Sequence, residues 1–155
     1  MGLQIFLTGA SGYLGGVLAE HLSRLPEVER ITGVGLTPPQ AALPPKVRFV
    51  PMDIRSPQLM SLVAGHQVVI HTACVVLWSA RMPASVRDDI NLNGTDNVAR
   101  TARANGVARF LHASSMAVYD PRRARGQSGV SEDFPKGGRI RSSITGARRR
   151  RRSES

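Results

Sequence analysis

The chain has 155 residues, of which 41% are hydrophobic, and a formal net charge of +10. This length and composition favour one globular domain with its own hydrophobic core. The single cysteine, Cys74, excludes an intramolecular disulfide bond. The absence of a long apolar run and of a leader-like amino terminus predicts a cytoplasmic protein without a membrane partner.

The positive charge is concentrated at the carboxyl end. Between residues 136 and 155, eight basic residues stand against one acidic residue and account for +7 of the net charge of +10. The preceding 135 residues therefore carry only +3. Nucleic acid is consequently expected as a partner only non-specifically, through the arginine run at residues 148–152.

The first predicted unit is a strand, a glycine-rich turn and a helix. Residues 3–8 (LQIFLT) form a short apolar run, which is typical of a strand buried on both faces in a parallel sheet. The helix after the turn has apolar positions at spacings of three and four residues. This spacing predicts one buried stripe: Leu14, Val17, Leu18, His21, Leu22 and Leu25. Pro26 marks the end of this helix.

The later elements alternate in the same way. Further strands are predicted at residues 31–36, 47–52, 67–72 and 107–113. A short helix is expected at residues 57–64 and a long one at about 85–105, ended by Gly106 in the left-handed conformation. This alternation predicts an α/β fold with a doubly wound parallel sheet of about five strands.

The texture of the sequence changes after Asp120. The remaining residues show little apolar periodicity and are rich in glycine, serine and arginine. We therefore expect a folded domain at residues 1–120 and a basic, disordered tail at residues 121–155.

The strongest local signal is TGASGYLG, which lies between the first predicted strand and helix. Gly9 permits a tight turn, Gly12 lets the backbone approach a pyrophosphate, and Gly15 allows the helix to pack closely on the strand. The amino end of the helix then offers free N–H groups and a positive dipole to phosphates. This pattern predicts binding of a dinucleotide.

Five motifs in this order resemble the extended short-chain dehydrogenases/reductases, which include NAD-dependent epimerases, dehydratases and 3β-hydroxysteroid dehydrogenase-like enzymes. The motifs are TGASGYLG, the pair Asp53-Ile54, the tetrapeptide HTAC at residues 71–74, NLNGT at residues 91–95 and SSMAVY at residues 114–119. The resemblance spans residues 1 to about 120. It implies the NAD(P)-binding, Rossmann-type part of such an enzyme, with a sheet that is incomplete on its carboxyl-terminal side. The full-length relative would act on a sugar-nucleotide or hydroxysteroid-like small molecule.

The resemblance also implies which residues contact the cofactor: Gly9, Ser11, Gly12, Tyr13, Leu14, Gly15, Asp53, Ile54, Ala73 and Asn91. The carboxylate of Asp53 would bond the adenine amino group, although the same residue is also suited to cap the next helix. For Asn91, the sequence does not decide between a structural role and a role in the site. His71 and Cys74 have the spacing of two metal ligands, but one pair is too few for a site, so no metal is expected.

Ser115 is the catalytic candidate. The resemblance implies that its hydroxyl bonds the substrate oxygen that gains or loses a proton. The family's tyrosine and lysine, in a YxxxK pattern, are absent, because no tyrosine follows Tyr119 and the later lysine, Lys136, follows a proline. The chain is therefore expected to be inactive as it stands, and a truncated or frame-shifted enzyme is the leading interpretation. A non-enzymatic dinucleotide-binding or redox-sensing module and a module with a nucleic-acid-binding tail are the alternatives.

Two further expectations concern the cofactor and the sheet edge. An acidic residue at the end of the second strand would select NAD, and an arginine nearby would favour NADP. Gly35 stands there, so the choice between NAD and NADP stays open. The fifth strand would be an unpaired edge of an incomplete sheet. Because such an edge can pair with another chain, we expect self-association.

Overall fold

The computed structural model describes residues 2–75, 82–115, 118–119 and 131–134. The chain divides into two units, Met1–Ala113 and Ser114–Ser155. The helices and strands named below belong to the first unit. The predicted tail at residues 121–155 lies outside the described residues, apart from residues 131–134.

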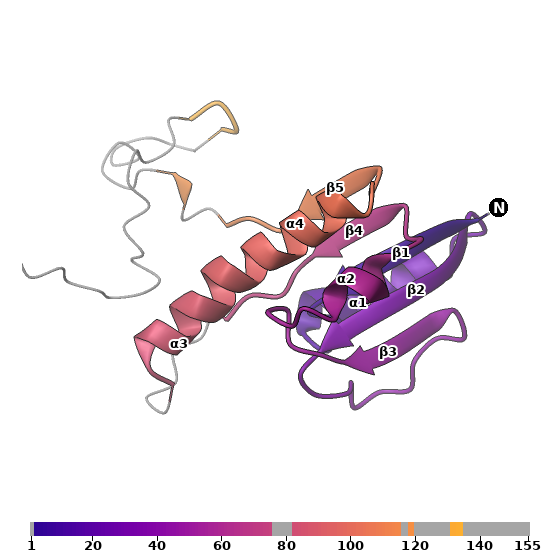
Figure 1. Ribbon diagram of the computed structural model, residues 1–155. Coiled ribbons are helices and arrows are strands. Elements are labelled where there is room, and N and C mark those ends of the chain that lie inside the picture. Colours follow the sequence, from indigo (N-terminus) through magenta and orange to yellow (C-terminus); the bar gives the residue numbers. More distant parts are fainter. Residues whose placement is uncertain (1, 76–81, 116–117, 120–130, 135–155) are drawn as a thin grey trace, which may run out of the picture. The chain divides into compact units, whose positions relative to one another are not determined.

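The first unit is built on a sheet of five parallel strands in the order β3-β2-β1-β4-β5 (Figure 1). The strands are β1 Leu3–Thr8, β2 Val28–Gly35, β3 Val47–Pro51, β4 Val68–His71 and β5 Arg109–His112. The register places Thr8 at the end of β1 beside Val34 of β2 and His71 of β4. The predicted α/β fold with a doubly wound, Rossmann-type parallel sheet is confirmed.

Helices connect these strands. They are α1 Tyr13–Ser23, α2 Leu59–Val63, α3 Ala84–Asp88 and α4 Thr95–Ala104, with a π-helical turn, η1 Asp89–Gly94, between α3 and α4. The long helix predicted at about residues 85–105 is therefore confirmed in extent (Figure 1). The π turn inside it is an unpredicted feature. In the described residues, no helix has the length and apolar character needed to cross a lipid bilayer.

The end of α4 explains why β5 starts later than predicted. Gly106 has a φ of 66°, as expected for a left-handed stop. Its N–H bonds the carbonyl of Arg103 at 3.1 Å, and the N–H of Val107 bonds the carbonyl of Ala102 at 3.0 Å. These are the two hydrogen bonds of a Schellman motif. Because Val107 completes the helix cap, β5 begins at Arg109 and not at residue 107.

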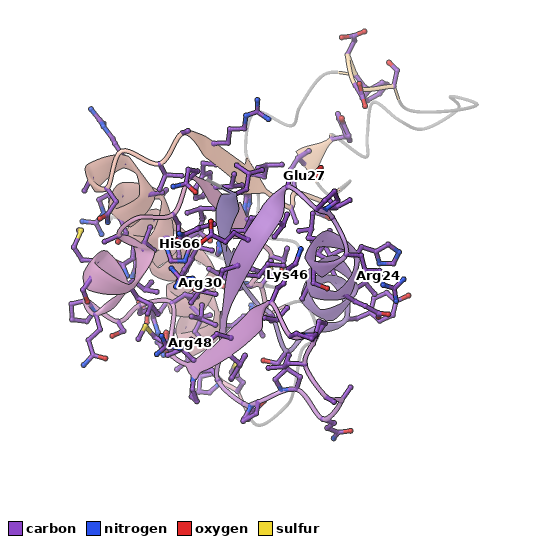
Figure 2. The ribbon with its side chains drawn as sticks, turned by 90° about the vertical axis from the view of Figure 1, so that its right-hand side faces the viewer. Arg24, Glu27, Arg30, Lys46, Arg48 and His66 are labelled. Carbon is purple, nitrogen blue, oxygen red and sulfur yellow. The ribbon has the colours of Figure 1, made fainter. Side chains whose placement is uncertain are left out.

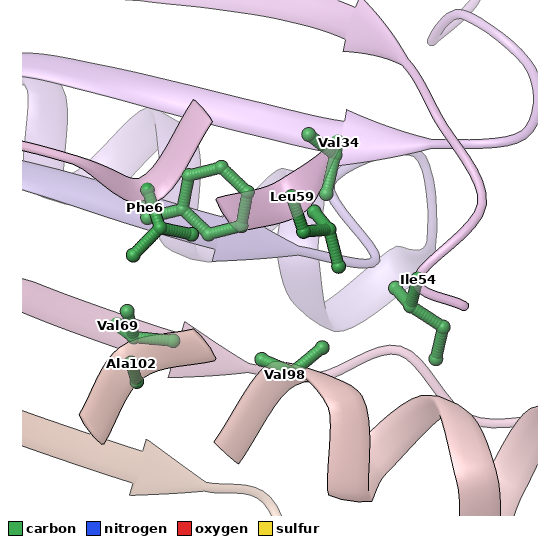
Figure 3. Packing of buried hydrophobic residues seen from close by; sticks show 8 residues of the cluster. Phe6, Val34, Ile54, Leu59, Val69, Val98 and Ala102 are labelled. Carbon is green, nitrogen blue, oxygen red and sulfur yellow. The ribbon is translucent and has the colours of Figure 1, made fainter. Parts of the chain in front are cut away.

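Apolar side chains cover both faces of the sheet, as expected for parallel strands. Phe6 of β1 belongs to a cluster on the side of α2 and α4 (Figure 3): Phe6, Val34, Ile54, Leu59, Val63, Val69, Val98 and Ala102. Ile5 and Leu7, its neighbours along β1, belong to the second cluster on the side of α1: Ile5, Leu7, Ala10, Ala19, Val28, Ile31 and Val47. Because side chains alternate between the two faces of the sheet, β1 contributes residues to both clusters.

The predicted buried stripe of α1 is confirmed only in part, because Leu18 and Leu22 are partly buried and pack against the second cluster. The buried residues of α1 are Gly15, Ala19 and Ser23, whereas Leu14 and Val17 are exposed. The helix lies on its small residues because a Cβ on Gly15 would overlap the carbonyl oxygen of Gly9, so the two backbones are in direct contact. Leu22 also lines an open groove, together with Leu25 after the end of the helix and with residues of β5.

The outer strand β5 forms one edge of the described sheet. Each of its four residues is exposed, including Phe110 and Leu111. An unpaired edge with exposed apolar side chains favours pairing with another chain. The expected self-association stays a prediction that rests on this edge.

Candidate functional site

The glycine turn lies at the centre of the carboxyl edge of the sheet. It joins the end of β1 at Thr8 to the start of α1 at Tyr13. On one side of β1 the chain continues through β2 and β3, and on the other side lie β4 and β5 (Figure 1). In open parallel sheets, ligands bind at this reversal of winding, outside the carboxyl ends of the strands.

The three glycines of the turn meet different surroundings. Gly9 has a φ of 72°, and a Cβ on it would lie 2.7 Å from the backbone nitrogen of Ala73. A Cβ on Gly15 would overlap Gly9 itself. A Cβ on Gly12 would have one neighbour within 4 Å, the carbonyl oxygen of Gly9 at 3.2 Å. Packing therefore requires Gly9 and Gly15, whereas Gly12 leaves open space at the amino end of α1.

The first turn of α1 presents backbone donors to this space. Gly12 is the N-cap residue and makes no side-chain capping bond, and the first helical bond runs from the N–H of Gly16 to the carbonyl of Gly12 at 2.9 Å. The N–H groups of Tyr13, Leu14 and Gly15 precede that bond and have no acceptor within the helix. No acidic residue lies in the first turn. This end can accept an anionic group such as a phosphate.

The predicted contacts of Tyr13, Leu14 and Ser11 differ in kind. The side chain of Tyr13 is 91% exposed and that of Leu14 is exposed as well, so their donors to the open space are backbone groups. Ser11 brings its hydroxyl over the end of β2, where a Cβ on Gly35 would overlap it. The structure thus brings Ser11 together with the glycine turn and with β2.

A buried hydrogen-bonded chain lies directly beneath the turn. The Thr8 hydroxyl contacts Nδ1 of His71 at 2.6 Å, and Nε2 of His71 contacts the Thr95 hydroxyl at 2.9 Å. The N–H of Ala73 donates to the Thr8 hydroxyl at 3.3 Å. The proton of the Thr8 hydroxyl remains available for Nδ1, and the tautomer that accepts it there carries its own proton on Nε2, facing Thr95. The chain joins the ends of β1 and β4 to the start of α4.

His71 is held neutral in this chain. It is fully buried, and burial, with a smaller repulsion from His112, lowers its pKa to about 4. The two imidazole rings are stacked with their centroids 5.1 Å apart. Thr8, His71 and Thr95 escaped the sequence prediction as a group, although each occupies a fixed place in a motif: Thr8 begins TGASGYLG, His71 begins HTAC and Thr95 ends NLNGT.

Asn91 of η1 supports the segment that follows β4. Its Oδ1 accepts the N–H of Val75 at 2.8 Å, and its Nδ2 donates to the carbonyl of Val75 at 3.1 Å. This pair of bonds is the structural role that the sequence left open. The position of Ala73 is fixed in a related way, by its contact with Gly9 and its bond to Thr8. Cofactor contacts of Asn91 and Ala73 stay predictions.

The carboxylate of Asp53 is engaged by Arg55. Oδ1 of Asp53 accepts the backbone N–H and Nε of Arg55 at 2.8 and 3.0 Å, and Oδ2 lies 2.6 Å from Nη2. These bonds hold the pKa of Asp53 below its ordinary value. Arg55 also pairs with Asp89 at 2.6 Å. A bond from Asp53 to an adenine amino group would have to be made beside this ion pair.

Ile54 belongs to the hydrophobic core. It is 5% exposed. Its side chain packs against Gly94 so closely that a Cβ on Gly94 would lie 2.6 Å from Cδ1 of Ile54. Its carbonyl accepts Nδ2 of Asn97 at 2.8 Å. The predicted cofactor contact of Ile54 is therefore restricted to its remaining backbone groups.

The catalytic candidate Ser115 lies in the second unit of the chain. Its carbonyl oxygen accepts the N–H of Val118 at 3.1 Å. The ring of Tyr119 packs edge-to-face on Phe134 with centroids 6.3 Å apart.

Among the described residues, no group of three or more histidine, cysteine, aspartate or glutamate side chains is placed to hold a metal ion.

Comparison with known proteins gives a family match over most of the chain. A model of the NAD dependent epimerase/dehydratase family matches residues 5–138. Human 3 beta-hydroxysteroid dehydrogenase type 7 is 31% identical over 127 residues, which are 77% of this chain and 34% of that protein. Short-chain dehydrogenase/reductase family 42E member 1 of Danio rerio is 29% identical over 117 residues, 74% of this chain and 30% of that protein.

Solved structures show the same partial coverage. A mutant uronate dehydrogenase from Agrobacterium tumefaciens, complexed with NAD, is 28% identical with a TM-score of 0.64 and covers 77% of this chain and 43% of its own. The enzyme WbmH of Bordetella bronchiseptica, in complex with NAD+, is 25% identical with a TM-score of 0.71 and covers 88% and 47%. The chain spans about a third of the length of the curated relatives it matches.

Proposed function

Because this chain belongs to the NAD dependent epimerase/dehydratase family, we propose that it binds a nicotinamide dinucleotide, NAD or NADP, with the pyrophosphate at the amino end of α1. The observation that carries the proposal is the open space over Gly12, faced by the unbonded N–H groups of the first helical turn. A pyrophosphate suits this place, because it needs close backbone approach and N–H donors.

Each predicted site residue has a part in this proposal. Gly9 and Gly15 shape the turn, Gly12 admits the pyrophosphate, and the backbone N–H groups of Tyr13 and Leu14 donate to it. Ala73 lies in the segment after β4, which would run beside the nicotinamide ribose, and Asn91 holds this segment in place. Asp53 and Ile54 face the adenine, with Ile54 contributing backbone groups. When bound, the dinucleotide supplies the ring that takes up or releases a hydride.

Gly12→Val tests the site in a variant whose folding is checked separately. A valine side chain at this position would occupy the proposed place of the pyrophosphate, and its Cβ would lie 3.2 Å from the carbonyl oxygen of Gly9. We expect wild-type chain to give a binding heat with NAD+ in titration calorimetry and the variant to give none. A cooperative thermal transition of the variant shows that it is folded in this comparison.

Gly16→Ala is the matched control for this experiment. Gly16 is exposed on α1, and a Cβ on it would have its nearest neighbour 4.0 Å away. This variant should bind dinucleotide as the wild type does. Unchanged binding by folded Gly12→Val would remove the glycine turn from the proposal.

The reaction class is proposed from the relatives, which include a hydroxysteroid dehydrogenase and a uronate dehydrogenase. We propose that the chain supplies the dinucleotide-binding part for oxidation, epimerisation or dehydration of a hydroxyl-bearing substrate such as a sugar nucleotide or a hydroxysteroid. Ser115 would hydrogen-bond the reacting oxygen, as its place in SSMAVY implies.

By itself, this polypeptide should not turn over. Ser115 can polarise a carbonyl, but no tyrosine follows Tyr119 to donate or accept the proton. A positioned general acid or base contributes roughly a hundred- to ten-thousand-fold in rate. Steady NADH production from a uronate or hydroxysteroid by the purified chain would contradict this expectation.

A further inference from the structure

In the part of the chain that the structure describes, the corner of the site nearest the end of β2 carries no charge. In dinucleotide-binding folds of this type, a carboxylate at this position bonds the ribose 2′-hydroxyl of NAD, and an arginine nearby accommodates the 2′-phosphate of NADP. Here β2 ends at Gly35, which has no side chain. No charged residue occurs in the sequence between Arg30 and Lys46, nor between Met1 and Glu20. Both segments that meet at this corner are therefore neutral.

The Ser11 hydroxyl occupies the place of the missing side chain. A Cβ on Gly35 would overlap Oγ of Ser11 and would lie 3.5 Å from two ring atoms of Phe49. The glycine turn thus delivers a hydroxyl to the point from which an acidic side chain of β2 would otherwise start. A hydroxyl both donates and accepts hydrogen bonds, so it can serve a 2′-hydroxyl or a 2′-phosphate.

The basic residues of β2 and β3 do not supply the missing charge. Arg48 pairs with Thr32, three residues before Gly35 and so about 10 Å along the strand from it. By strand alternation, Arg48 lies on the opposite face of the sheet from Phe49, the residue beside Gly35. Figure 2 labels Arg30 on β2, Arg48 on β3 and Lys46, which comes directly before β3.

The other cations of this region already have partners. Arg30 donates to Oε1 of Gln4 at 2.6 Å, and Lys46 donates to the carbonyl of Leu25 at 2.8 Å. Beyond the end of β3, the guanidinium of Arg55 is paired with Asp53 and Asp89. Among the described residues, neither a carboxylate nor an unpaired guanidinium is therefore available at this corner to discriminate at the ribose.

We propose that this site takes NAD and NADP with comparable affinity, because the ribose 2′ group meets the uncharged Ser11 hydroxyl over Gly35 in place of a charged side chain. This inference rests on the proposed dinucleotide binding and adds its specificity. Ser11 and Gly35 are its specificity-determining residues. The dinucleotide's 2′-phosphate would be neither repelled by an acid nor paired with a base.

Titration calorimetry of the full chain with NAD+ and with NADP+, at one ionic strength, tests the proposal. The two dissociation constants of the wild type should agree within about tenfold. Gly35→Asp restores a carboxylate, and Ser11→Ala combined with Gly35→Asp also removes the overlapping hydroxyl. Both variants should weaken NADP+ relative to NAD+ by about tenfold or more. Leu36→Asp, at an exposed neighbouring position, should shift the ratio in the same direction if the Gly35 variants do not fold.

The outcomes separate this inference from the function on which it rests. If the wild type binds neither dinucleotide, the proposed function fails. If it binds one of them about a hundredfold more tightly than the other, dinucleotide binding stands and the inference of comparable affinity is overturned. An unchanged ratio in the folded Asp variants would also overturn it, because the ribose would then lie elsewhere. Gly16→Ala should leave both constants and their ratio unchanged.

Discussion

Replacing His71 with phenylalanine should destabilise the first unit and change its response to pH. The aromatic ring is retained, but the Thr8 and Thr95 hydroxyls lose their contacts with the imidazole at 2.6 and 2.9 Å. Each hydrogen bond contributes about 1 kcal/mol, and a buried hydroxyl whose proton is left without an acceptor costs about 1–3 kcal/mol more. Thr8 is fully buried. We therefore expect a loss of about 2–4 kcal/mol at pH 7.

The pH dependence follows from the lowered pKa of His71. Its pKa is about 4 in the folded chain against an ordinary value of 6.5, because burial disfavours the charged ring. The unfolded chain therefore binds a proton more readily as the pH falls. The neutral histidine contributes stability that is fully present above pH 6.5 and is lost as the pH falls towards 4. The gap between these pKa values corresponds to about 3 kcal/mol.

Urea denaturation between pH 4 and pH 7.5 measures both effects. Other groups titrate in this range, so the informative quantity is the difference in unfolding free energy between wild type and His71→Phe. This difference should shrink by about 3 kcal/mol as the pH falls from 7.5 to 4. His21→Phe, at an exposed position of α1, is the control and should follow the wild type. A constant difference across this range would refute a buried, neutral His71.

Two further predictions concern the glycine turn and the tail. Gly15→Ala should lower the melting temperature, at a cost of about 1–3 kcal/mol, because its Cβ overlaps the Gly9 backbone, whereas Gly16→Ala should be neutral or stabilising. Retained stability in Gly15→Ala would contradict the close packing. Deleting residues 136–155 should leave the melting temperature and dinucleotide binding unchanged but reduce salt-sensitive retention on nucleic acid. Unfolding on deletion would contradict the assignment of this segment as a tail.

Much of the first unit could be predicted from the sequence, because its signals are local. Residues 3–8 form β1 as predicted, since a short apolar run next to a glycine turn specifies a buried strand without reference to distant residues. The stop at Gly106 was predictable for the same reason, because a left-handed residue favours glycine wherever it occurs. The order of such elements then implied a parallel, doubly wound sheet.

The glycine turn could also be predicted from the sequence. The spacing of Gly9, Gly12 and Gly15 expresses three backbone requirements that lie within one strand-turn-helix unit. Which glycine faces the ligand and which ones face the protein was decided by the packing of the turn. Ala73, from the segment after β4, closes on Gly9, and Gly15 packs on Gly9, so the open space is left over Gly12.

Contacts between distant residues were decided by the tertiary structure alone. The periodicity of α1 predicted a leucine stripe, of which Leu18 and Leu22 do pack against the core. The helix nevertheless buries Gly15 and Ala19, because direct backbone contact with the turn governs how it lies. Thr8 and His71 are 63 residues apart in sequence, and parallel pairing of β1 and β4 places them side by side. Strand order and register are set by the whole sheet, so no local pattern contains this partnership.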